Sequence, residues 1–480
     1  MVQETLYFYD LETSGVNPRA DRIMQFAGQR TDLDLKPIGQ PDNFLISLTD
    51  DILPVPEAIL ITSITPQQTR QDGISEKDFA KWFYKDVATL KTTILGYNSL
   101  RFDNEFIRFL MWRNFYDAYL WSYDQTSTWD ILDTVRMTRA LRPGGIEWPF
   151  SSEGKPTNRL EMLTYINKLE HNNAHDALSD VNATIAVAKL IKTNQPKLFS
   201  YLFDMRNKKA IQKLVNSETP FVYTSGRYPS ETLHTTAVVR LSDHPSYNGG
   251  QVLVYDLRHN PEPFMSLTIE QLEERLKYTK DQNADPRLPV KALAFNKCPA
   301  VAPLAVLDKK AQKNINLTPD QINNNLKILY SDPTFVERIR QVFLRQKESH
   351  QQALLPNIYS VDGQLYDGFV SDKDKHFCQQ IRESSATELA DLHPAFGDER
   401  LTPLLLLYKA RQMPKSLSEQ EQAQWESYKN TKLTTGNDNS MLANYFKVIK
   451  QLYETTKDDS KQALLKDLWF WGESIAPADI

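Results

Sequence analysis

The sequence has few cysteines, no long apolar run and no excess of positive charge. Only two cysteines occur in 480 residues, Cys298 and Cys378. Their spacing fits no metal site, so a reduced, cytoplasmic setting is expected. The longest purely apolar stretches, such as residues 403–407, are far shorter than the roughly 20 residues that a membrane-spanning helix needs. A basic-then-apolar secretory pattern is also missing at the N-terminus, and we expect no membrane association.

The charge balance excludes a broadly basic nucleic-acid binder. The net charge is −5 and the pI is near 6.0. Any binding to phosphates must therefore depend on local basic patches. The segment 197–213 is one candidate, with five basic residues against a single acid, Asp204. The alternative interpretation of this segment is a solvated helix face. A composition that is 41% hydrophobic and 24% charged is otherwise typical of a soluble globular protein.

The pattern of strand-like and helix-like segments changes twice along the chain. A chain of 480 residues is too long for one ordinary core, so two or three domains are expected. Residues 1–195 alternate strand-like and helix-like stretches, as in an α/β domain, and residues 75–90 begin with a Ser-x-x-Asp helix start. Between residues 220 and 305, short β-like segments separated by Gly, Pro and Asn indicate a small barrel.

The rest of the chain is predicted to be mostly helical, with a boundary in the polar segment 345–357. No internal repeat or low-complexity tract interrupts it. We therefore predict three domains: an α/β domain over 1–195, a β-barrel domain over 196–350 and a helical domain over 355–480.

Asp10 and Glu12 lie in the strand-like segment "YFYDLETSG". Alternate side chains of a strand share a face, so these two carboxylates should project together while Leu11 points away. Two neighbouring carboxylates repel each other unless a cation lies between them. Carboxylate oxygens are the ligands that Mg²⁺ and Mn²⁺ prefer. Such pairs also occur on exposed strand ends, so this pair alone does not identify a metal site.

Three further residues add to this chemistry. Asp103 precedes a predicted helix, where its alternative role is that of a helix N-cap. Asp180 lies about one turn inside the helix predicted over 175–193. Its alternative role there is that of an acid that interacts favourably with the helix dipole and has no part in catalysis. His175 precedes that helix and titrates near neutrality, although most single histidines are surface or packing residues. Four carboxylates with a histidine able to accept a proton from water favour metal-assisted cleavage of a phosphodiester.

Residues 101–142 are rich in aromatic and basic side chains. Ten aromatic residues lie between Phe102 and Trp129, and the segment has six arginines. Stacking on aromatic rings together with cationic contacts to phosphate holds single strands without regard to sequence. Helical spacing instead predicts that most of the following aromatics are core residues: Phe106, Phe109, Trp112 and Phe115.

The order of these motifs resembles the DEDD exonuclease superfamily, in the branch that carries a histidine before the last aspartate. Asp-x-Glu is followed by "GYN…FD" and then by His-x-x-x-x-Asp, with the flanks "DLETSG" and "AHDALSD". This match covers residues 1–195. The stretches "ILGYNSLRFDNEFIR", "ALRPGGIEWP" and "VKALAFNKCPAVAPL" are similar to bacterial members that degrade single-stranded DNA processively from its 3′ end.

The resemblance implies a fold and a set of roles. The fold is a ribonuclease H-like exonuclease domain followed by an SH3-like β-barrel domain and a C-terminal α-helical domain. His175 is the implied general base. The implied ligands of two Mg²⁺ ions, for which Mn²⁺ is able to substitute, are Asp10, Glu12, Asp103 and Asp180.

The resemblance also implies contacts with other molecules. The acidic, hydrophobic C-terminal tail of single-stranded DNA-binding protein is an implied partner, with Arg142 and the basic residues of 197–213 as candidate contacts, and the protein is expected to be a monomer. Arg159 has an alternative role in an ion pair with Glu161. The residues expected to contact the DNA strand are Glu12, Arg159, Arg108, Tyr119, Tyr123 and Arg136.

The expected function is hydrolysis of single-stranded DNA, in the 3′-to-5′ direction and to 5′-mononucleotides, in DNA repair and recombination. One alternative is an RNA-directed 3′-to-5′ exonuclease, because no motif here reveals contacts to a 2′-hydroxyl. A second is a catalytically silent module that binds single strands. The silent alternative is disfavoured because all five catalytic positions have competent residue types.

Overall fold

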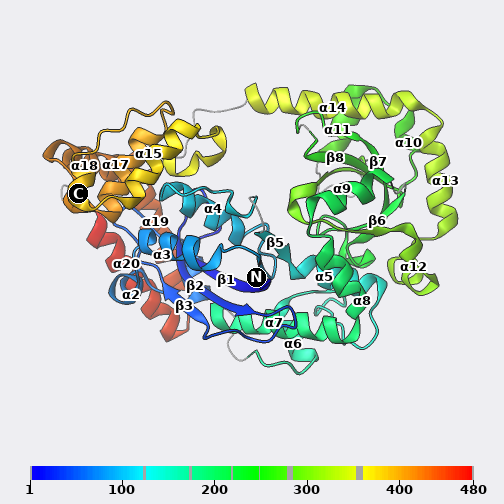
Figure 1. The fold of residues 1–480 in the computed structure, drawn as a ribbon, viewed down its shortest axis with the longest axis horizontal. Coiled ribbons are helices and arrows are strands. Elements are labelled where there is room, and N and C mark those ends of the chain that lie inside the picture. The colour runs from blue at the N-terminus through cyan, green and yellow to red at the C-terminus, as the bar shows by residue number, and fades with distance from the viewer. Residues whose placement is uncertain are drawn as a thin grey trace. The chain divides into compact units, whose positions relative to one another are not determined.

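The computed structural model describes residues 3–122, 126–171, 176–217, 220–247, 249–277, 285–352 and 360–477. The chain forms two compact units, and each is described by itself. Unit 1 consists of residues 1–127, 172–182 and 358–480, and unit 2 consists of residues 128–171 and 183–357. Figure 1 labels the helices and strands in chain order.

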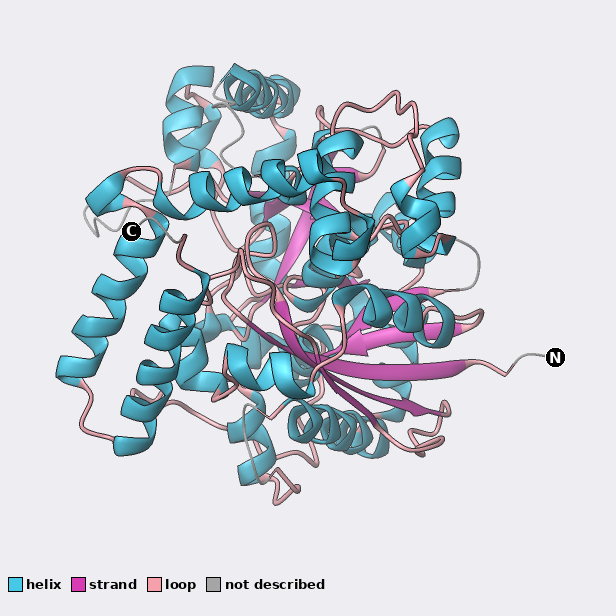
Figure 2. Cartoon of the chain, turned by 90° about the vertical axis from the view of Figure 1, so that its left-hand side faces the viewer, coloured by secondary structure: helices cyan, strands magenta, loops and turns pink. Residues whose placement is uncertain are grey.

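The N-terminal sheet is built around strand β1. Its strands follow the order β3-β2-β1-β4-β5, in which β1 pairs antiparallel with β2 and parallel with β4. Helices pack beside these strands (Figure 2). The strands are β1 (Thr5–Thr13), β2 (Ile23–Thr31), β3 (Asp42–Leu45), β4 (Thr92–Gly96) and β5 (Ser127–Asp130).

The helices of unit 1 come from both ends of the chain. The predicted start of the helix after residue 75 is confirmed, because the Ser75 hydroxyl accepts from the backbone N–H of Asp78. That helix is α only as far as Trp82 and continues as one π-helical turn, Phe83–Val87. The α-helices are α1 (Pro56–Thr62), α2 (Pro66–Asp72), α3 (Glu76–Trp82), α4 (Asp103–Arg113), α15 (Asp372–Glu383), α16 (Ala386–Ala390), α17 (Leu401–Gln412), α18 (Glu419–Thr434), α19 (Met441–Thr455) and α20 (Asp459–Ile475).

One hydrophobic core joins the sheet to the C-terminal helices. Tyr9 of β1 and Phe26 of β2 are buried together with Phe109 of α4, and the same cluster contains Ile381 of α15 and Leu404 of α17. The prediction that most of these four aromatics are core residues is confirmed, because Phe106, Phe109 and Trp112 of α4 and Phe115 after it are at most 4% exposed. Burial of this much apolar surface fixes the strand that carries Asp10.

A buried network of charges also ties the C-terminal helices to the N-terminal sheet. Arg411 of α17 donates to both Asp51 and Asp362, with N–O distances of 2.6 and 2.8 Å. Arg22, which precedes β2, donates to Asp362 at 2.7 Å, and Lys432 of α18 donates to Asp51 at 2.8 Å. Burial opposes ionisation of Asp51, but Arg411 and Lys432 hold its pKa well below the usual range. Breaking such a pair leaves an uncompensated buried charge, so the network holds the two segments in one arrangement.

Unit 2 contains a five-stranded antiparallel sheet in the order β10-β6-β7-β8-β9. Its strands are β6 (Phe221–Thr224), β7 (Thr235–Asp243), β8 (Gln251–Asp256), β9 (Val290–Ala294) and β10 (Ala300–Pro303). The helices are α5 (Ile131–Leu141), α6 (Leu160–Ile166), α8 (Pro196–Asp204), α9 (Lys208–Ser217), α10 (Glu262–Met265), α11 (Ile269–Leu276), α12 (Lys309–Ile315), α13 (Pro319–Tyr330) and α14 (Pro333–Gln352). Helix α7 (Ala177–Asn194) begins in unit 1 and continues in unit 2.

The predicted succession of an α/β fold, a small β-sheet domain and a helical segment is confirmed. The polar segment predicted as a boundary is helical as far as Gln352, the last residue of α14. Within the described residues, no helix is long and apolar enough to cross a membrane. The domain boundaries at 195/196 and 350/355 stay a proposal.

Candidate metal centre

Strand β1 and the turn after it position the first two acids. Asp10 pairs in register with Ala27 of β2, and Glu12 pairs with Gln25. The register shifts between Glu12 and Thr13, and such a bulge bends a strand and increases its twist. The following turn needs glycine, because a Cβ at Gly15 would lie 2.3 Å from the Asp21 carboxylate. The strand therefore ends immediately after the two carboxylates.

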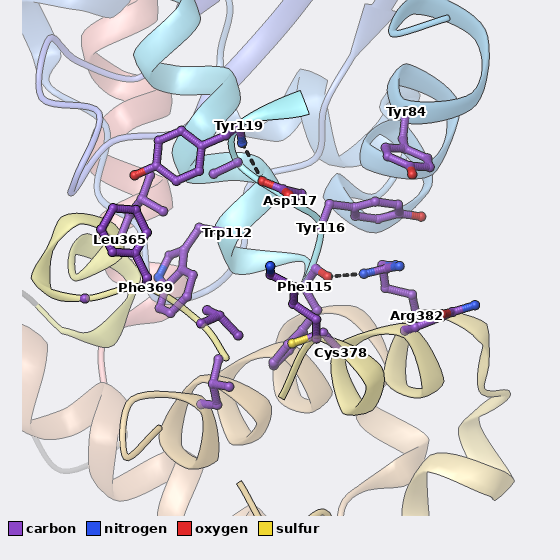
Figure 3. Close-up of a pocket in the computed structure, with 16 residues that line it drawn as sticks. Tyr84, Trp112, Phe115, Tyr116, Asp117, Tyr119, Leu365, Phe369, Cys378 and Arg382 are labelled. Atoms are coloured by element: carbon purple, nitrogen blue, oxygen red, sulfur yellow. Dashed lines mark hydrogen bonds between the residues drawn. The ribbon is translucent and has the colours of Figure 1, made fainter. Parts of the chain in front are cut away.

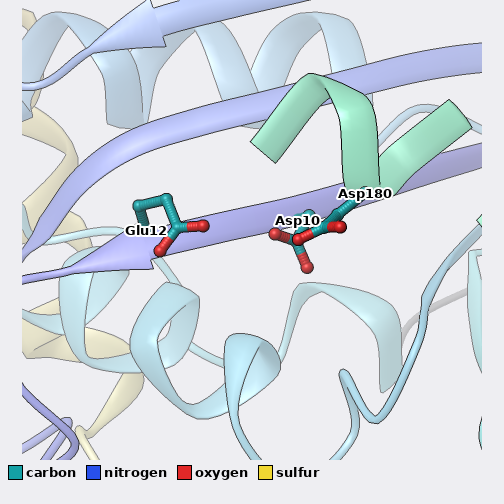
Figure 4. Close-up of side chains that lie close together, drawn as sticks. All are labelled: Asp10, Glu12 and Asp180. Atoms are coloured by element: carbon teal, nitrogen blue, oxygen red, sulfur yellow. The ribbon is translucent and has the colours of Figure 1, made fainter. Parts of the chain in front are cut away.

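Asp180 completes a compact group of three carboxylates. It lies in the first turn of α7, and one carboxylate oxygen each from Asp10, Glu12 and Asp180 lies within 4.8 Å of the others. Figure 4 shows the Asp10 and Asp180 side chains next to each other, with Glu12 further along the strand. The predicted projection of Asp10 and Glu12 from one face of the strand is confirmed by this spacing.

Asp103 is the first residue of α4 and is 4% exposed. It is not the N-cap of this helix, because Phe102 has that position and makes no side-chain capping bond. Asp103 lies outside the group of three oxygens, but its charge acts on the pKa of both Asp10 and Glu12. The structure thus brings all four predicted acids into electrostatic contact.

A buried hydrogen bond connects the two segments that carry Asp10 and Asp103. The Tyr9 hydroxyl donates to Asn104 Oδ1 at 2.5 Å, and both residues are at most 2% exposed. Each residue is the immediate neighbour of one of the two acids in the sequence. The bond therefore restrains the start of α4 relative to β1.

The electrostatics of this group oppose ionisation. Burial raises the pKa of Asp10 well above its usual range, and the charges of Asp103 and Asp180 add to this effect. Burial and, next in size, the charge of Asp180 raise the pKa of Glu12 to about 8. Among the described residues, no lysine or arginine forms an ion pair with Asp10 or Glu12. Within the part of the chain that the structure describes, the charges of Asp10 and Glu12 are therefore not compensated by a lysine or an arginine.

The donor set fits a divalent ion of the hard type. Carboxylate oxygens are the ligands that magnesium and manganese prefer. A bound cation would reverse the direction of the pKa shifts by favouring the ionised carboxylates. The cluster, together with the family described below, indicates the use of a divalent metal.

The remaining predicted site residues lie in different surroundings. Tyr123 and His175 fall outside the described residues. Arg108 of α4 forms an ion pair with Glu105 at 3.2 Å and lies over the ring of Tyr119, 5.6 Å from its centroid. Both residues belong to unit 1, the unit that contains the four acids.

Two predicted site residues belong to unit 2. Arg136 of α5 forms an ion pair with Asp133 at 2.6 Å and packs against Gly226. The Arg159 side chain is 74% exposed, and its N–O distance to Glu161 is as long as 3.9 Å, so this ion pair is a loose one. Exposed pairs of this kind contribute little to stability.

Two residues near these sites were not predicted from the sequence. Asp176 accepts from the backbone N–H of Ser179 at the start of α7, and its charge raises the pKa of Asp10 and Glu12. The sequence signal for Asp176 is the first of the two acids in "HDALSD", one helical turn before Asp180. Tyr366 donates to Glu105 and also contacts Arg108 across 258 positions of the sequence. No local pattern predicts a contact over that separation.

Comparison with known protein families accounts for nearly the whole chain. The family model described as exonuclease matches residues 7–188. The exonuclease I SH3-like domain matches residues 206–345, and the exonuclease I C-terminal domain matches residues 359–475.

Individual relatives are similar over their full length. Exodeoxyribonuclease I of Escherichia coli (strain K12) is 40% identical over 478 residues, covering 98% of each chain. The Haemophilus influenzae protein of the same name is 38% identical, covering 98% of this chain and 99% of that one. The crystal structure of E. coli exonuclease I in complex with a dA16 oligonucleotide has a TM-score of 0.93 at 39% identity, covering 99% of this chain and 100% of that one. From these matches, the chain belongs to the exodeoxyribonuclease I family.

Proposed function

We propose that the protein is an exodeoxyribonuclease that degrades single-stranded DNA in the 3′-to-5′ direction to 5′-mononucleotides, and that it acts in DNA repair and recombination. The observation that carries this proposal is the convergence of Asp10, Glu12 and Asp180, next to Asp103, in a chain that matches exonuclease I over its full length. Relatives solved with dA16 and dT13 oligonucleotides support single-stranded DNA as the substrate.

Two Mg²⁺ ions are the proposed cofactors, with Mn²⁺ able to substitute. Asp10, Glu12, Asp103 and Asp180 would hold them, since oxygens of Asp10, Glu12 and Asp180 lie within 4.8 Å of one another and the charge of Asp103 acts on the pKa of Asp10. When bound, the ions supply positive charge that stabilises the charge developing on the scissile phosphate. A relative has been solved in a zinc-bound form, which is consistent with a divalent-ion site in the family.

His175 is the proposed general base. It would take a proton from the attacking water, since an imidazole titrates near neutral pH. In the sequence it precedes Asp180 by five residues, and helix α7 begins at Ala177. Glu12 is proposed to bind metal and also to contact the end of the DNA strand.

The proposed contacts to the DNA strand are Arg108, Tyr119, Tyr123, Arg136 and Arg159. The Arg108 guanidinium carbon lies over the rings of Tyr119 and Trp121, 5.6 and 5.5 Å from their centroids. A guanidinium next to aromatic rings is suited to phosphate and base contacts. The weak, exposed pairing of Arg159 leaves its guanidinium available for a phosphate.

We further propose that the protein acts as a monomer in the cytoplasm and that it docks the acidic tail of single-stranded DNA-binding protein. Lys208, Lys209 and Lys213 of α9 and Lys197 of α8 are exposed, which supports a basic docking patch there. Arg142 is 37% exposed on its side chain and pairs with Asp308 at 3.2 Å.

The substrate is tested with the purified protein, Mg²⁺ and end-labelled single-stranded DNA, duplex DNA and RNA. We expect mononucleotides from the 3′ end of the single-stranded DNA alone. Asp10→Ala should lower this rate at least about a thousandfold, which corresponds to ~4 kcal/mol of lost transition-state stabilisation.

Asp34→Asn, which changes an exposed acid of the same domain, serves as the matched control and should retain full activity. Preferential degradation of RNA would favour the RNA-directed exonuclease. Tight binding of the strand without any cleavage would favour the silent module, and either result would contradict the proposal.

The raised pKa of Glu12 predicts how the stability of the metal-free protein depends on pH. The unfolded chain loses this proton near the usual glutamate pKa, whereas the folded protein keeps it up to about pH 8. Folded stability therefore falls as pH rises between these two values, and Glu12→Gln should remove part of the loss. We expect Glu12→Gln to stabilise the protein in EDTA by about 2 kcal/mol near pH 8.5, and by much less near pH 5.

Urea unfolding at both pH values measures this difference. Glu57→Gln, at an exposed position of α1, is the control and should change stability little at either pH. An equal effect of Glu12→Gln at the two pH values would show that its ionisation is not penalised by folding.

The bond between Tyr9 and Asn104 is predicted to position Asp10 and Asp103 for metal binding. Tyr9→Phe removes one buried hydroxyl without changing the packing of the ring. We expect a several-fold increase in the Mg²⁺ concentration that gives half-maximal rate, with an unchanged KM for DNA. Binding of Mn²⁺ to the free protein, followed by electron paramagnetic resonance, should weaken in parallel.

Tyr7→Phe is the matched control, because Tyr7 lies on the same strand and its hydroxyl donates to Asp42 at 2.6 Å. It should lower stability to a similar extent and leave the Mg²⁺ requirement unchanged. Equal metal requirements in the two variants would assign the Tyr9 hydroxyl a purely structural role.

A further inference from the structure

The short 3₁₀ helix η6, Val361–Gly363, contacts two elements of the metal centre. The backbone oxygen of its first residue accepts from the Trp112 indole N–H at 2.8 Å, and α4, which contains Trp112, begins with Asp103. The backbone oxygen of its last residue accepts from Arg19 Nη1 at 3.1 Å. Arg19 lies in the turn of residues 14–22, which directly follows β1. One short segment from the C-terminal part of the chain is therefore bonded to both elements that carry the first three acids.

Packing reinforces the contact between α4 and the segment that contains η6. Leu365 follows η6 by two residues, and Leu365 and Trp112 are both 4% exposed members of one hydrophobic cluster. Figure 3 shows these two side chains in the lining of a single cavity. Their burial holds η6 against the end of α4.

The middle residue of η6 is Asp362, which is 2% exposed and binds two arginines. Its Oδ2 accepts from Arg22 Nη2 at 2.7 Å, and Arg411 of α17 donates to both carboxylate oxygens, at 2.8 and 2.9 Å. Burial opposes ionisation of Asp362, but Arg411 and Arg22 hold its pKa below the usual value. A fixed negative charge thus determines where the Arg22 guanidinium lies.

Arg22 in turn fixes the residues that follow Glu12. Its Nη1 donates to the backbone oxygens of Ala20 and Asp21, at 2.8 and 3.1 Å. Its backbone N–H donates to Ser14 Oγ at 2.9 Å, and its backbone oxygen accepts from the Ser14 N–H at 2.8 Å. Ser14 is fully buried and is the second residue after Glu12. A displacement of Arg22 would therefore reach Glu12 across only one intervening residue.

The bulge of β1 makes this anchor necessary. The register between β1 and β2 shifts between Glu12 and Thr13, and a bulge interrupts the ladder of strand hydrogen bonds. Strand pairing alone therefore holds Glu12 less firmly than Asp10, which lies inside the regular part of the strand.

We propose that Asp362 is a positioning residue of the metal centre, which holds Glu12 at the correct spacing from Asp10 and Asp180 through Arg22 and the turn of residues 14–22. The inference rests on the proposed function, because it concerns the divalent ions that these acids would hold. Coupling between two sites is reciprocal. Metal binding and the docking of η6 therefore strengthen each other, although Asp362 does not touch the ions.

The first test uses the unmodified protein without DNA. Hydrogen exchange followed by mass spectrometry is compared in EDTA and in Mg²⁺. Mg²⁺ should slow exchange about threefold in peptide 361–367 as well as in peptide 13–23, because the N–H groups of Gly363 and Gln364 are hydrogen-bonded at η6. Peptide 456–462, between α19 and α20, is the control and should exchange at one rate in both solutions. Protection of 13–23 without any protection of 361–367 would overturn the coupling.

The second test compares Asp362→Asn with Glu421→Gln. Glu421 is a matched control because it accepts from Lys409 Nζ at 2.6 and 2.8 Å, a pair that joins α17 to α18, and Lys409 is 2% exposed. Each substitution leaves a buried cation of α17 without its full countercharge, so both should lower stability in urea. Asp362→Asn alone should weaken binding of Mn²⁺ to the free protein, by about tenfold in electron paramagnetic resonance titrations.

A double-mutant cycle tests the route through Arg22. Arg22→Gln should weaken Mn²⁺ binding about as much as Asp362→Asn, and the variant with both substitutions should lose little more than either one. Losses that simply multiply would show that Asp362 does not act through Arg22 and would overturn the proposed route.

The outcomes separate this inference from the proposed function. Unchanged Mn²⁺ affinity in Asp362→Asn, or an equal loss in Glu421→Gln, would assign Asp362 a purely structural role and overturn the inference. If Asp362→Asn does not fold, the exchange experiment on the unmodified protein decides alone. Equal Mn²⁺ binding by Asp10→Ala and the unmodified protein would instead contradict the proposed metal centre itself.

Discussion

The mutual repulsion of buried carboxylates is the constraint on which the rest of the structure depends. Asp10, Glu12 and Asp180 are held together although burial and their own charges oppose ionisation. Such an arrangement costs folding free energy at neutral pH unless a cation enters. The surrounding frame must therefore be strong enough to keep the acids in place before a metal ion binds.

The frame is built from distant parts of the chain. β1 lies in the middle of its sheet, Tyr9 is bonded to Asn104 of α4, and the core under β1 includes residues of α15 and α17. The charges of Arg22, Arg411 and Asp362 fix the C-terminal helices to the segment that follows β1. Removing one partner of this network would leave a buried charge, so the C-terminal helices support the site as well as cover the sheet.

The sequence predicted the local features well, because they depend on short-range rules. The shared face of Asp10 and Glu12 follows from the two-residue period of a strand, and the start of α3 follows from the Ser75 cap. The meeting of Asp180 with Asp10 could be predicted only from the family resemblance, since no local rule brings residues so far apart together. The contact of Arg108 with Tyr366 depends on packing between segments more than 200 residues apart, which neither periodicity nor motif spacing encodes.

We expect that bound cations, rather than protein side chains, neutralise the charge of the four acids. Anomalous diffraction from crystals soaked in Mn²⁺ tests this claim most directly. We expect two adjacent peaks, about 3.5–4 Å apart, among the carboxylates of Asp10, Glu12, Asp103 and Asp180. Crystals in which manganese leaves this group empty, while these side chains keep their positions, would contradict it.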